Sequence, residues 1–358
     1  MQTPKSTQFF LGANSPSGFY SLYNHLIDLQ TDNTLYIIKG GPGCGKSSFM
    51  RKVADGIQDA GLDVEHIYCT ADPDSLDAIY IPALKVAYVD GTAPHIIEPN
   101  YPGVMEEYLN LGEFYETEPL KEKKAEVMAL TKTYKSLYQR AYHCIEAAGS
   151  VNSDASASMI DDKVIAAVKK RTRGIISREM SKQKNSTGII RYRFLSALTH
   201  KGHISCFNTI ETLAQRVYHL DNILGLAHYM LEDLVKAAEQ AGLNAVLCPD
   251  PMNPEQFAHL IIPSLSLAFL SSNNQIQYEG ESFRHIRLDA MVDANRLKSQ
   301  KPRLRFAKKV SALLLDEAVS TLADAKLVHD ELERLYNPYV DWGGVYDLAE
   351  EHLQRLLS

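Results

Sequence analysis

The chain has 358 residues and a formal net charge of −7, which fits about two globular domains and argues against a basic surface for nucleic-acid binding. Its 45% hydrophobic residues and five cysteines without a C-x-x-C pair fit a globular protein of a reducing cytoplasm and exclude a disulfide framework. No signal peptide is predicted at the polar start of the chain, and residues 260–270, the most apolar stretch, are too few to span a membrane.

The first predicted elements form a strand–helix–strand unit. Residues 34–38 are a bounded apolar run typical of a buried strand. Residues 47–60 place apolar side chains on one helical face, and Gly61 is positioned to end that helix. Residues 64–68 and 84–89 predict two further strands. This order predicts an α/β fold built on a parallel sheet.

Long helical arms follow in each half. Apolar residues recur at alternating spacings of three and four over residues 127–148 and again over 314–335, and packing within one chain is favoured over a dimer contact. Residues 151–158 are rich in Ser, Ala and Asn and predict a linker. Residues 161–193 carry ten Lys and Arg against three acids, which indicates either a solvated helical face or a contact with a partner or phosphate.

The sequence repeats itself. At a shift of 181, eight of the 28 residues from 60 to 87 recur, whereas ordinary residue usage gives about two. A shift of 184 aligns the preceding segments, with Phe10 on Phe194 and Asn24 on Asn208. These matches predict a tandem duplication: a first domain at 1–150, a linker and basic helical segment at 151–190, and a second repeat at 191–358.

A phosphate-binding motif lies between the first predicted strand and helix. The string from Gly40 to Ser47 matches G-x-x-x-x-G-K-[ST], which arises by chance in a chain of this length on the order of 1% of the time. Such a loop presents backbone N–H groups to the phosphates of a nucleoside triphosphate, while its lysine reaches the β- and γ-phosphates and its hydroxyl holds Mg²⁺. The predicted cofactor-binding residues are Gly40, Gly41, Pro42, Gly43, Cys44, Gly45, Lys46, Ser47 and Ser48.

Acidic residues near this loop are candidates for the metal side of the site. Asp90 ends the predicted strand 84–89 and is the Walker-B candidate, so Ser47 and Asp90 are expected to hold the metal. Asp72 and Asp77 are further metal candidates, although the segment that contains them also fits an acidic turn.

The predicted catalytic residues are Lys46, Asp90, Thr92 and His95. Thr92 and His95 follow Asp90 at the end of the sheet where nucleotides bind in open α/β folds, so either could sense the γ-phosphate or orient a water. A purely structural histidine is the alternative for His95. Cys44 is expected to be a small filler of the loop.

The second repeat lacks this chemistry. At the shift of 181, Lys46 falls on Ala227 and Ser47 on His228. The three candidate carboxylates, Asp72, Asp77 and Asp90, fall on Asn253, Ala258 and Ser271. Their joint loss indicates that they serve one purpose, and it predicts a single nucleotide site in the chain.

Four strings carry a resemblance to a family. They are Ile38-Lys-Gly-Gly-Pro-Gly-Cys-Gly-Lys-Ser47, Cys69-Thr-Ala-Asp-Pro-Asp-Ser-Leu-Asp77, Val89-Asp-Gly-Thr-Ala-Pro-His95 and Pro99-Asn-Tyr-Pro-Gly103. With Phe10-Leu-Gly-Ala-Asn14, they resemble an uncharacterised family of bacterial tandem P-loop ATPases or ATP-binding proteins over nearly the whole chain. The resemblance implies ATP binding and a duplicated P-loop NTPase-type fold. This chain departs from the family in its degenerate second loop, residues 221–228.

The sequence therefore predicts an ATPase that uses ATP and Mg²⁺ at one N-terminal site, with a regulatory or structural second repeat. A small-molecule or nucleotide kinase and a non-catalytic, nucleotide-gated interaction module are the alternatives, and a protein partner stays open. An arginine from the basic segment 161–193 or from the second half could complete the site. The candidates are Arg171, Arg173, Arg178, Arg191, Arg193, Arg303 and Arg305.

Overall fold

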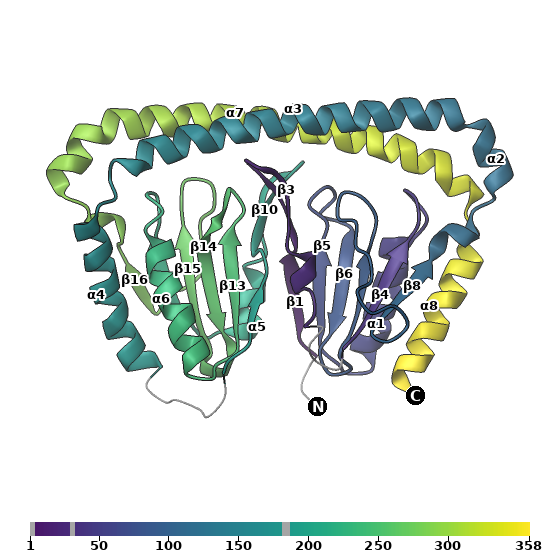
Figure 1. Cartoon of the computed structure of the whole chain (residues 1–358), viewed down its shortest axis with the longest axis horizontal. Helices are drawn as coiled ribbons and strands as arrows, with labels where there is room; N and C mark the ends of the chain where they lie inside the picture. Colours follow the sequence, from purple (N-terminus) through teal and green to yellow (C-terminus); the bar gives the residue numbers. More distant parts are fainter. Residues whose placement is uncertain (1–3, 29–32, 181–186) are drawn as a thin grey trace.

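Two six-stranded sheets stand side by side beneath a bridge of two long helices (Figure 1). The computed structural model describes residues 4–28, 33–180 and 187–358. Lys182 and Lys184 of the basic segment lie outside the described residues. No helix in these ranges is long and apolar enough to cross a membrane.

The first sheet has the strand order β1-β5-β6-β7-β4-β8. Its strands are β1 (Ser6–Phe10), β4 (Thr34–Lys39), β5 (Val64–Tyr68), β6 (Leu76–Ile81), β7 (Val86–Asp90) and β8 (Glu106–Asn110). Strand β6 is antiparallel to both neighbours, and the other pairs of the sheet are parallel. The sheet is therefore mixed, and the expectation of a wholly parallel sheet is wrong at β6. The chain makes tight turns before and after this strand, so no helix crosses over between β5 and β7.

The second sheet repeats this topology in the order β9-β13-β14-β15-β12-β16. Its strands are β9 (Ile190–Tyr192), β12 (Arg216–Asp221), β13 (Ala245–Asp250), β14 (Asn253–Ile262), β15 (Leu267–Ser272) and β16 (Arg284–Ile286). Strand β14 is reversed, as β6 is. The same strand order and the same reversed strand in both sheets confirm the predicted tandem duplication.

The two halves meet at equivalent residues. Hairpins β2 (Gly12–Ser15) with β3 (Gly18–Ser21) and β10 (Ser196–Thr199) with β11 (Gly202–Ser205) lie at the centre of the molecule (Figure 1). Phe10 N–H donates to Phe194 O at 2.9 Å, and Phe194 N–H donates to Phe10 O at 2.8 Å. Phe10 and Phe194 are the pair aligned by the shift of 184, so the repeats face each other about an approximate twofold axis.

A buried arginine fastens this junction. Arg193 has no exposed surface, and its Nε lies 2.6 Å from Glu65 Oε1 of β5. Three more of its N–H groups donate to the carbonyls of His25 and Leu26 in the first half and of Tyr192. Because four of its five N–H groups are used here and the side chain is fully buried, Arg193 joins the two halves and is not free to complete a nucleotide site.

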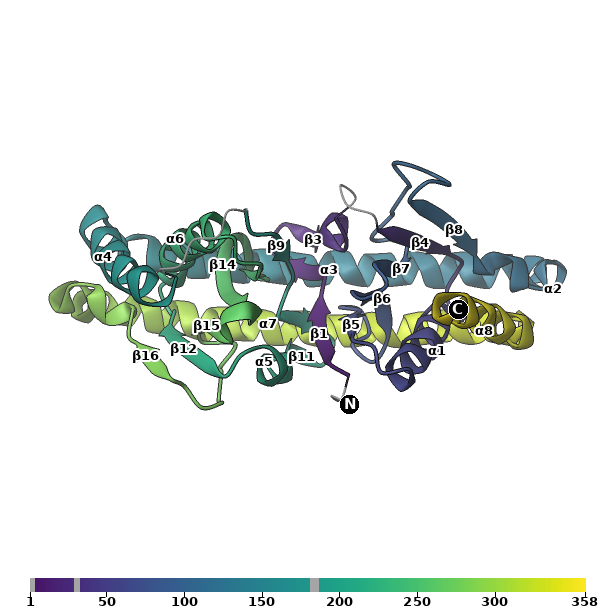
Figure 2. The same cartoon turned by 90° about the horizontal axis from the view of Figure 1, so that it is seen from below.

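The bridge consists of the long helices α3 (Lys124–Ala157) and α7 (Ala294–Tyr336), which run side by side in opposite directions (Figures 1 and 2). Small residues such as Ala141 and Ala318 are fully buried and let the two backbones approach closely. The predicted linker at residues 151–158 is wrong, because residues up to 157 belong to α3. There Asn152 Nδ2 donates to Ser311 Oγ of α7 at 2.8 Å.

The bridge exchanges a helix between the two halves. Helix α3 leads across to α4 (Asp162–Glu179), which packs on α6 (Ala227–Gln240) of the second half, and α7 leads back to α8 (Trp342–Leu357). Helix α8 packs on α1 (Lys46–Asp59) so closely that a Cβ at Gly56 would lie 2.2 Å from Leu353 Cδ2. The first sheet is thus covered by α8, which follows α7, and the second sheet by α4, which follows α3. Segments 1–150 and 191–358 are therefore not self-contained.

Shorter elements complete the chain. They are α2 (Thr117–Glu122), α5 (Asn208–Leu213) and the 3-10 helices Tyr23–His25, Leu111–Phe114, Pro263–Leu265, Asp289–Met291 and Asn337–Tyr339.

Candidate functional site

The glycine-rich loop joins β4 to α1 and ends in two left-handed residues. Gly43 has φ 67° and Gly45 has φ 88°, conformations in which a side chain is strained. Helix α1 begins directly afterwards at Lys46. The N–H groups of Gly43 and Gly45 donate to no acceptor within the described ranges. The loop thus brings unpaired backbone donors to the positive end of a helix, where an anion is stabilised.

Elements from far along the chain pack on the outside of this loop. Tyr115 Oη donates to Pro42 O at 3.0 Å. The Asn337 side-chain amide, at the end of α7, donates to Gly43 O at 2.9 Å. A Cβ at Gly45 would lie 3.0 Å from the Trp342 ring at the start of α8. The loop is therefore held in shape by the bridge and by the exchanged helix.

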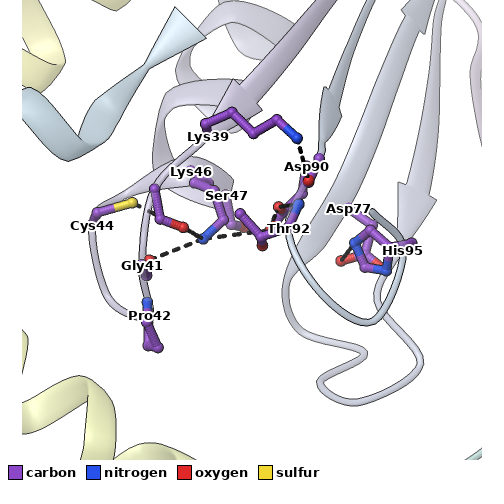
Figure 3. Close-up of polar contacts among 12 residues, drawn as sticks. Lys39, Gly41, Pro42, Cys44, Lys46, Ser47, Asp77, Asp90, Thr92 and His95 are labelled. Carbon is purple, nitrogen blue, oxygen red and sulfur yellow. Dashed lines mark hydrogen bonds and ion pairs between the residues drawn. The ribbon is translucent and has the colours of Figure 1, made fainter. Parts of the chain in front are cut away.

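Lys46 and Asp90 face each other across the loop (Figure 3). Lys46 Nζ donates to the carbonyls of Gly40 and Gly41, both at 3.0 Å, and lies 3.5 Å from Asp90 Oδ2. Cys44 is buried with its Sγ 4.0 Å from Lys46 Nζ, and burial raises the pKa of the thiol. Cys44 thus fills the loop, as the sequence predicts, and its thiol stays protonated.

The two serines of the motif have different surroundings. Ser47 Oγ accepts a hydrogen bond from Leu76 N–H at 2.9 Å, which ties the first turn of α1 to β6. Ser48 lines a surface depression between α1 and α8, together with Lys52 and Glu350. Ser47 is therefore placed on the sheet side of the loop and Ser48 toward the exchanged helix.

Thr92 orients the Asp90 carboxylate. Its N–H and its Oγ1 both donate to Asp90 Oδ1, at 2.8 Å and 2.5 Å. Both polar groups of Thr92 are used in this way, so the residue positions Asp90.

Asp77 and His95 lie together on the other side of Asp90 (Figure 3). Asp77 is buried, and its Oδ2 accepts a hydrogen bond from Tyr23 Oη at 2.5 Å. The His95 ring stacks on the Tyr23 ring with centroids 4.4 Å apart, and its Nε2 lies 3.9 Å from Asp77 Oδ1. Burial raises the pKa of Asp77, although the neighbouring His95 opposes this shift. The structure thus brings Asp77, Asp90 and His95 together, with their candidate ligand atoms within 4.8 Å of one another.

Asp72 does not join this cluster. It accepts hydrogen bonds from Asp74 N–H and Ser75 Oγ, as an acidic turn does, and lies 3.3 Å from Lys326 Nζ of α7. Burial alone would raise the pKa of Asp72, but the Lys326 ammonium and these hydrogen bonds hold it below its usual range. The turn alternative therefore describes Asp72, whereas Asp77 lies in β6.

Sequence reasoning missed several residues that shape the site. Lys39 Nζ donates to Gly91 O, Ile97 O and Glu98 Oε1 at 2.8–3.0 Å and so fastens the segment that follows Asp90. Tyr23 holds Asp77, and Asn337 holds the glycine loop. Lys39 could have been noticed because it directly precedes the motif. Tyr23 and Asn337 carry no local signal, since their contacts span long stretches of chain.

The second half has filled the equivalent loop with its own groups. The Asp289 carboxylate accepts hydrogen bonds from Ile223 N–H at 2.9 Å and Leu224 N–H at 3.1 Å. Asn222 Oδ1 accepts from Ala227 N–H at 2.8 Å, at the start of α6. The side chains of Leu224 and Leu226 are buried. In the second loop, carboxylate and amide oxygens of the chain thus accept the backbone N–H groups, and leucine side chains fill the space. The loop Gly40–Gly45 has no such leucines.

Two other arginines considered for the site, Arg178 and Arg303, are also paired with groups outside it. Arg178 donates to Tyr218 Oη and pairs with Glu179, and Arg303 pairs with Asp154 of the bridge. The basic helix α4 covers the second sheet, at the opposite end of the molecule from α1 (Figure 1). No family model, curated protein or solved structure matches the chain. Its function is accordingly inferred from the chemistry of the site.

Proposed function

We propose that this chain binds Mg·ATP at Gly40–Ser47 and hydrolyses it, with a fold of the P-loop NTPase type. The observation that carries the proposal is the convergence of unpaired loop amides, the Lys46 ammonium and the Asp90 carboxylate at one end of the first sheet. Strands β4 and β7 are parallel neighbours, with Ile38 opposite Asp90, so the loop and the acid leave the sheet at the same edge. Open α/β sheets bind nucleotides at this edge.

The residues present fit a magnesium ion. Mg²⁺ prefers oxygen ligands, and Ser47 and Asp90 supply a hydroxyl and a carboxylate. Ser47 Oγ accepts one hydrogen bond, from Leu76 N–H, and so keeps a lone pair for a ligand. Bound Mg²⁺ would neutralise charge on the β- and γ-phosphates.

The remaining roles belong to the chain itself. The loop amides bind phosphate oxygens, and Lys46 stabilises the negative charge that they carry. Lys46 leaves its carbonyl partners, Gly40 and Gly41, for the phosphates when the nucleotide enters. Thr92 keeps Asp90 in one orientation. Phosphoryl transfer needs mainly such positioning and charge stabilisation.

The second repeat is proposed to be structural or regulatory, so one nucleotide binds per chain. Asp289 already occupies the loop amides in the second half, and neither a lysine nor a hydroxyl stands at Ala227 and His228.

A nucleotide-gated interaction module is the second candidate, and one contact favours it. Asn337 at the end of α7 bonds to Gly43 O, and a Cβ at Gly43 would lie 3.1 Å from Glu333 O. A loop that rearranges around a triphosphate would therefore press on a bridge helix that also reaches the second half.

Calorimetry with Mg·ATP followed by turnover assays tests the proposal. We expect a stoichiometry near one and slow turnover that needs no acceptor. Asp90→Asn is expected to bind Mg·ATP within a few-fold of the natural chain and to lose turnover by about 100-fold or more, because charge stabilisation matters most in the transition state. Asp59→Asn, at the exposed end of α1, is the matched control and should change neither quantity.

Each other outcome contradicts a stated part of the proposal. Binding without turnover selects the gated module, and turnover that depends on an acceptor selects a kinase. Absence of binding contradicts the whole proposal, and a stoichiometry near two contradicts the assignment of a single site.

A further inference from the structure

His95 is a buried histidine without hydrogen-bond partners. It is 7% exposed, and neither ring nitrogen has a partner within the described ranges. Its Nε2 is 3.9 Å from Asp77 Oδ1, too far for a hydrogen bond. Leaving a buried donor or acceptor unsatisfied costs about 1–3 kcal/mol, so such a group in a native protein calls for an explanation.

Two carboxylates surround this ring in a ligand-like arrangement. The candidate ligand atoms of Asp77, Asp90 and His95 all lie within 4.8 Å of one another. Two ligands that bind one metal ion at about 2.1 Å are about 3.0–3.4 Å apart at tetrahedral or octahedral angles. The His95–Asp77 pair, now 3.9 Å apart, therefore has to close by about 0.5–0.9 Å around an ion.

Neighbouring side chains hold these three groups in place. Tyr23 Oη bonds to Asp77 Oδ2 and leaves Oδ1 toward His95 Nε2, while its ring stacks on the imidazole. Thr92 fixes Asp90 through two hydrogen bonds. Lys39 fastens the backbone at Gly91 and Ile97, on both sides of His95. Such outer partners orient the ligands in metal sites.

We propose that His95, Asp77 and Asp90 bind a divalent transition-metal ion beside the glycine-rich loop. An imidazole nitrogen distinguishes this site from one for Mg²⁺, because imidazole favours transition metals whereas Mg²⁺ prefers oxygen ligands. The site goes beyond the proposed nucleotide function, since its three ligands are assembled without a nucleotide. Asp90 links it to Lys46, whose Nζ is 3.5 Å from the same carboxylate.

Another cluster, His329, Asp330 and Glu333 on α7, is the natural comparison. It is only partly buried, and Asp330 is already paired with Lys326. We therefore assign the ion to the buried cluster and use His329 as the control.

Titration of the full chain with Co²⁺, without nucleotide, tests the site. We expect one Co²⁺ per chain with visible absorption bands, displaced by Zn²⁺ or Mn²⁺ but not by millimolar Mg²⁺. His95→Gln and Asp77→Asn should each weaken Co²⁺ binding by about 100-fold or more, because each removes a direct ligand. His329→Gln should leave the titration unchanged. Thermal unfolding verifies the fold of each variant, and the near-isosteric Asp77→Asn tests the site even if His95→Gln does not fold.

Lys46→Ala separates this inference from the proposed function. We expect it to lose Mg·ATP binding and to keep the Co²⁺ site, because Lys46 is not a ligand. The inference is overturned if the natural chain binds no Co²⁺, if Mg²⁺ competes as well as Zn²⁺, or if the Asp77→Asn chain binds Co²⁺ normally. Failure of Mg·ATP binding in the natural chain, with Co²⁺ bound, overturns the proposed function alone.

Discussion

The loops after β4 and β12 occupy the same place in two copies of one sheet, yet they differ in what satisfies their backbone. Among the described residues, the amides of Gly43 and Gly45 have no acceptor, whereas Ile223 and Leu224 donate to the Asp289 carboxylate. Burial raises the pKa of this carboxyl, although the two amides oppose the shift. The second half has thus supplied its own anion to a loop at the same place in the sheet.

One hydrogen bond survives in both halves. Leu76 N–H donates to Ser47 Oγ at 2.9 Å, and Phe257 N–H donates to His228 Nδ1 at 3.2 Å. These donors and acceptors are paired by the shift of 181. The position at the start of the helix therefore ties helix to sheet in both copies, and this role is separable from ligand binding.

The largest difference expected between the loops concerns the triphosphate. Lys46→Ala should weaken Mg·ATP binding by about 100-fold or more, about 3 kcal/mol, because a mostly buried ammonium no longer meets the phosphates. The fold should persist, since within the described residues Lys46 Nζ contacts loop carbonyls, Cys44 Sγ and Asp90 but no residue of the core sheet interior. Calorimetry measures the affinity, with Lys52→Ala on the same helix as control. Unchanged affinity would show that the first loop is as inert as the second.

A half-buried acid, Asp250, distinguishes the second half at the position that corresponds to Cys69. Burial raises the pKa of Asp250 to about 6, although the N–H groups of Met252 and Asn253 oppose the shift. The folded chain therefore holds a proton that the unfolded chain releases, so this group's contribution to stability is present below about pH 4 and is lost as the pH rises through about 6.

Asp250→Asn should remove this loss. We expect thermal unfolding at pH 7 to show a gain of at most about 3 kcal/mol over the natural chain, and little difference at pH 4. Asp55→Asn, exposed on α1, is the control and should show no such dependence on pH. A gain that is equal at both pH values would contradict a raised pKa of Asp250 in the folded chain.

Removing the internal anion should cost stability without affecting the nucleotide. Asp289→Ala leaves the N–H groups of Ile223 and Leu224 without their acceptor and should lower the free energy of unfolding by about 1–3 kcal/mol. Denaturant unfolding measures this change, with Glu281→Ala at an exposed position as control. We expect the affinity for Mg·ATP to stay constant, and a marked fall would reveal coupling between the two loops.

The smallest effect concerns the shared hydrogen bond. Ser47→Ala and His228→Ala should each lower the free energy of unfolding by about 1 kcal/mol. Only Ser47→Ala should also reduce Mg²⁺-dependent turnover, because only that side chain belongs to the proposed nucleotide site. Equal loss of turnover in the two variants would contradict the division between a working and a structural loop.

Local sequence patterns predicted the local structure around the loop. The strand at 34–38, the helix at 47–60 and the strand at 64–68 match β4, α1 and β5 to within a residue. Asp90 was expected near Lys46 because adjacent parallel strands end at the same edge, and the two groups are 3.5 Å apart. These features depend on the spacing of apolar residues, on the positions of glycines and on the order of strands, all of which can be read from a short segment of sequence.

The rest depends on partners that are distant in sequence. Residues 151–158 were interpreted as a linker because small residues usually mark loops, but in α3 the same small residues allow a close approach to α7. The reversed strand β6 separates Asp72 from Asp77, which the sequence had grouped in one turn. Nothing local shows that His95 would lack a hydrogen-bond partner, since that follows from the packing of Tyr23 and Asp77 around it.

The exchange of helices sets the order in which the molecule can be completed during synthesis. The glycine-rich loop and α1 are among the first segments made, yet α1 packs on α8, which comprises 16 residues at the far end of the chain. A nascent chain that has finished only its first half exposes the face of α1 that Leu353 later covers. Such transiently exposed apolar surface favours aggregation or chaperone binding. The half that is synthesised first is therefore the last to become complete.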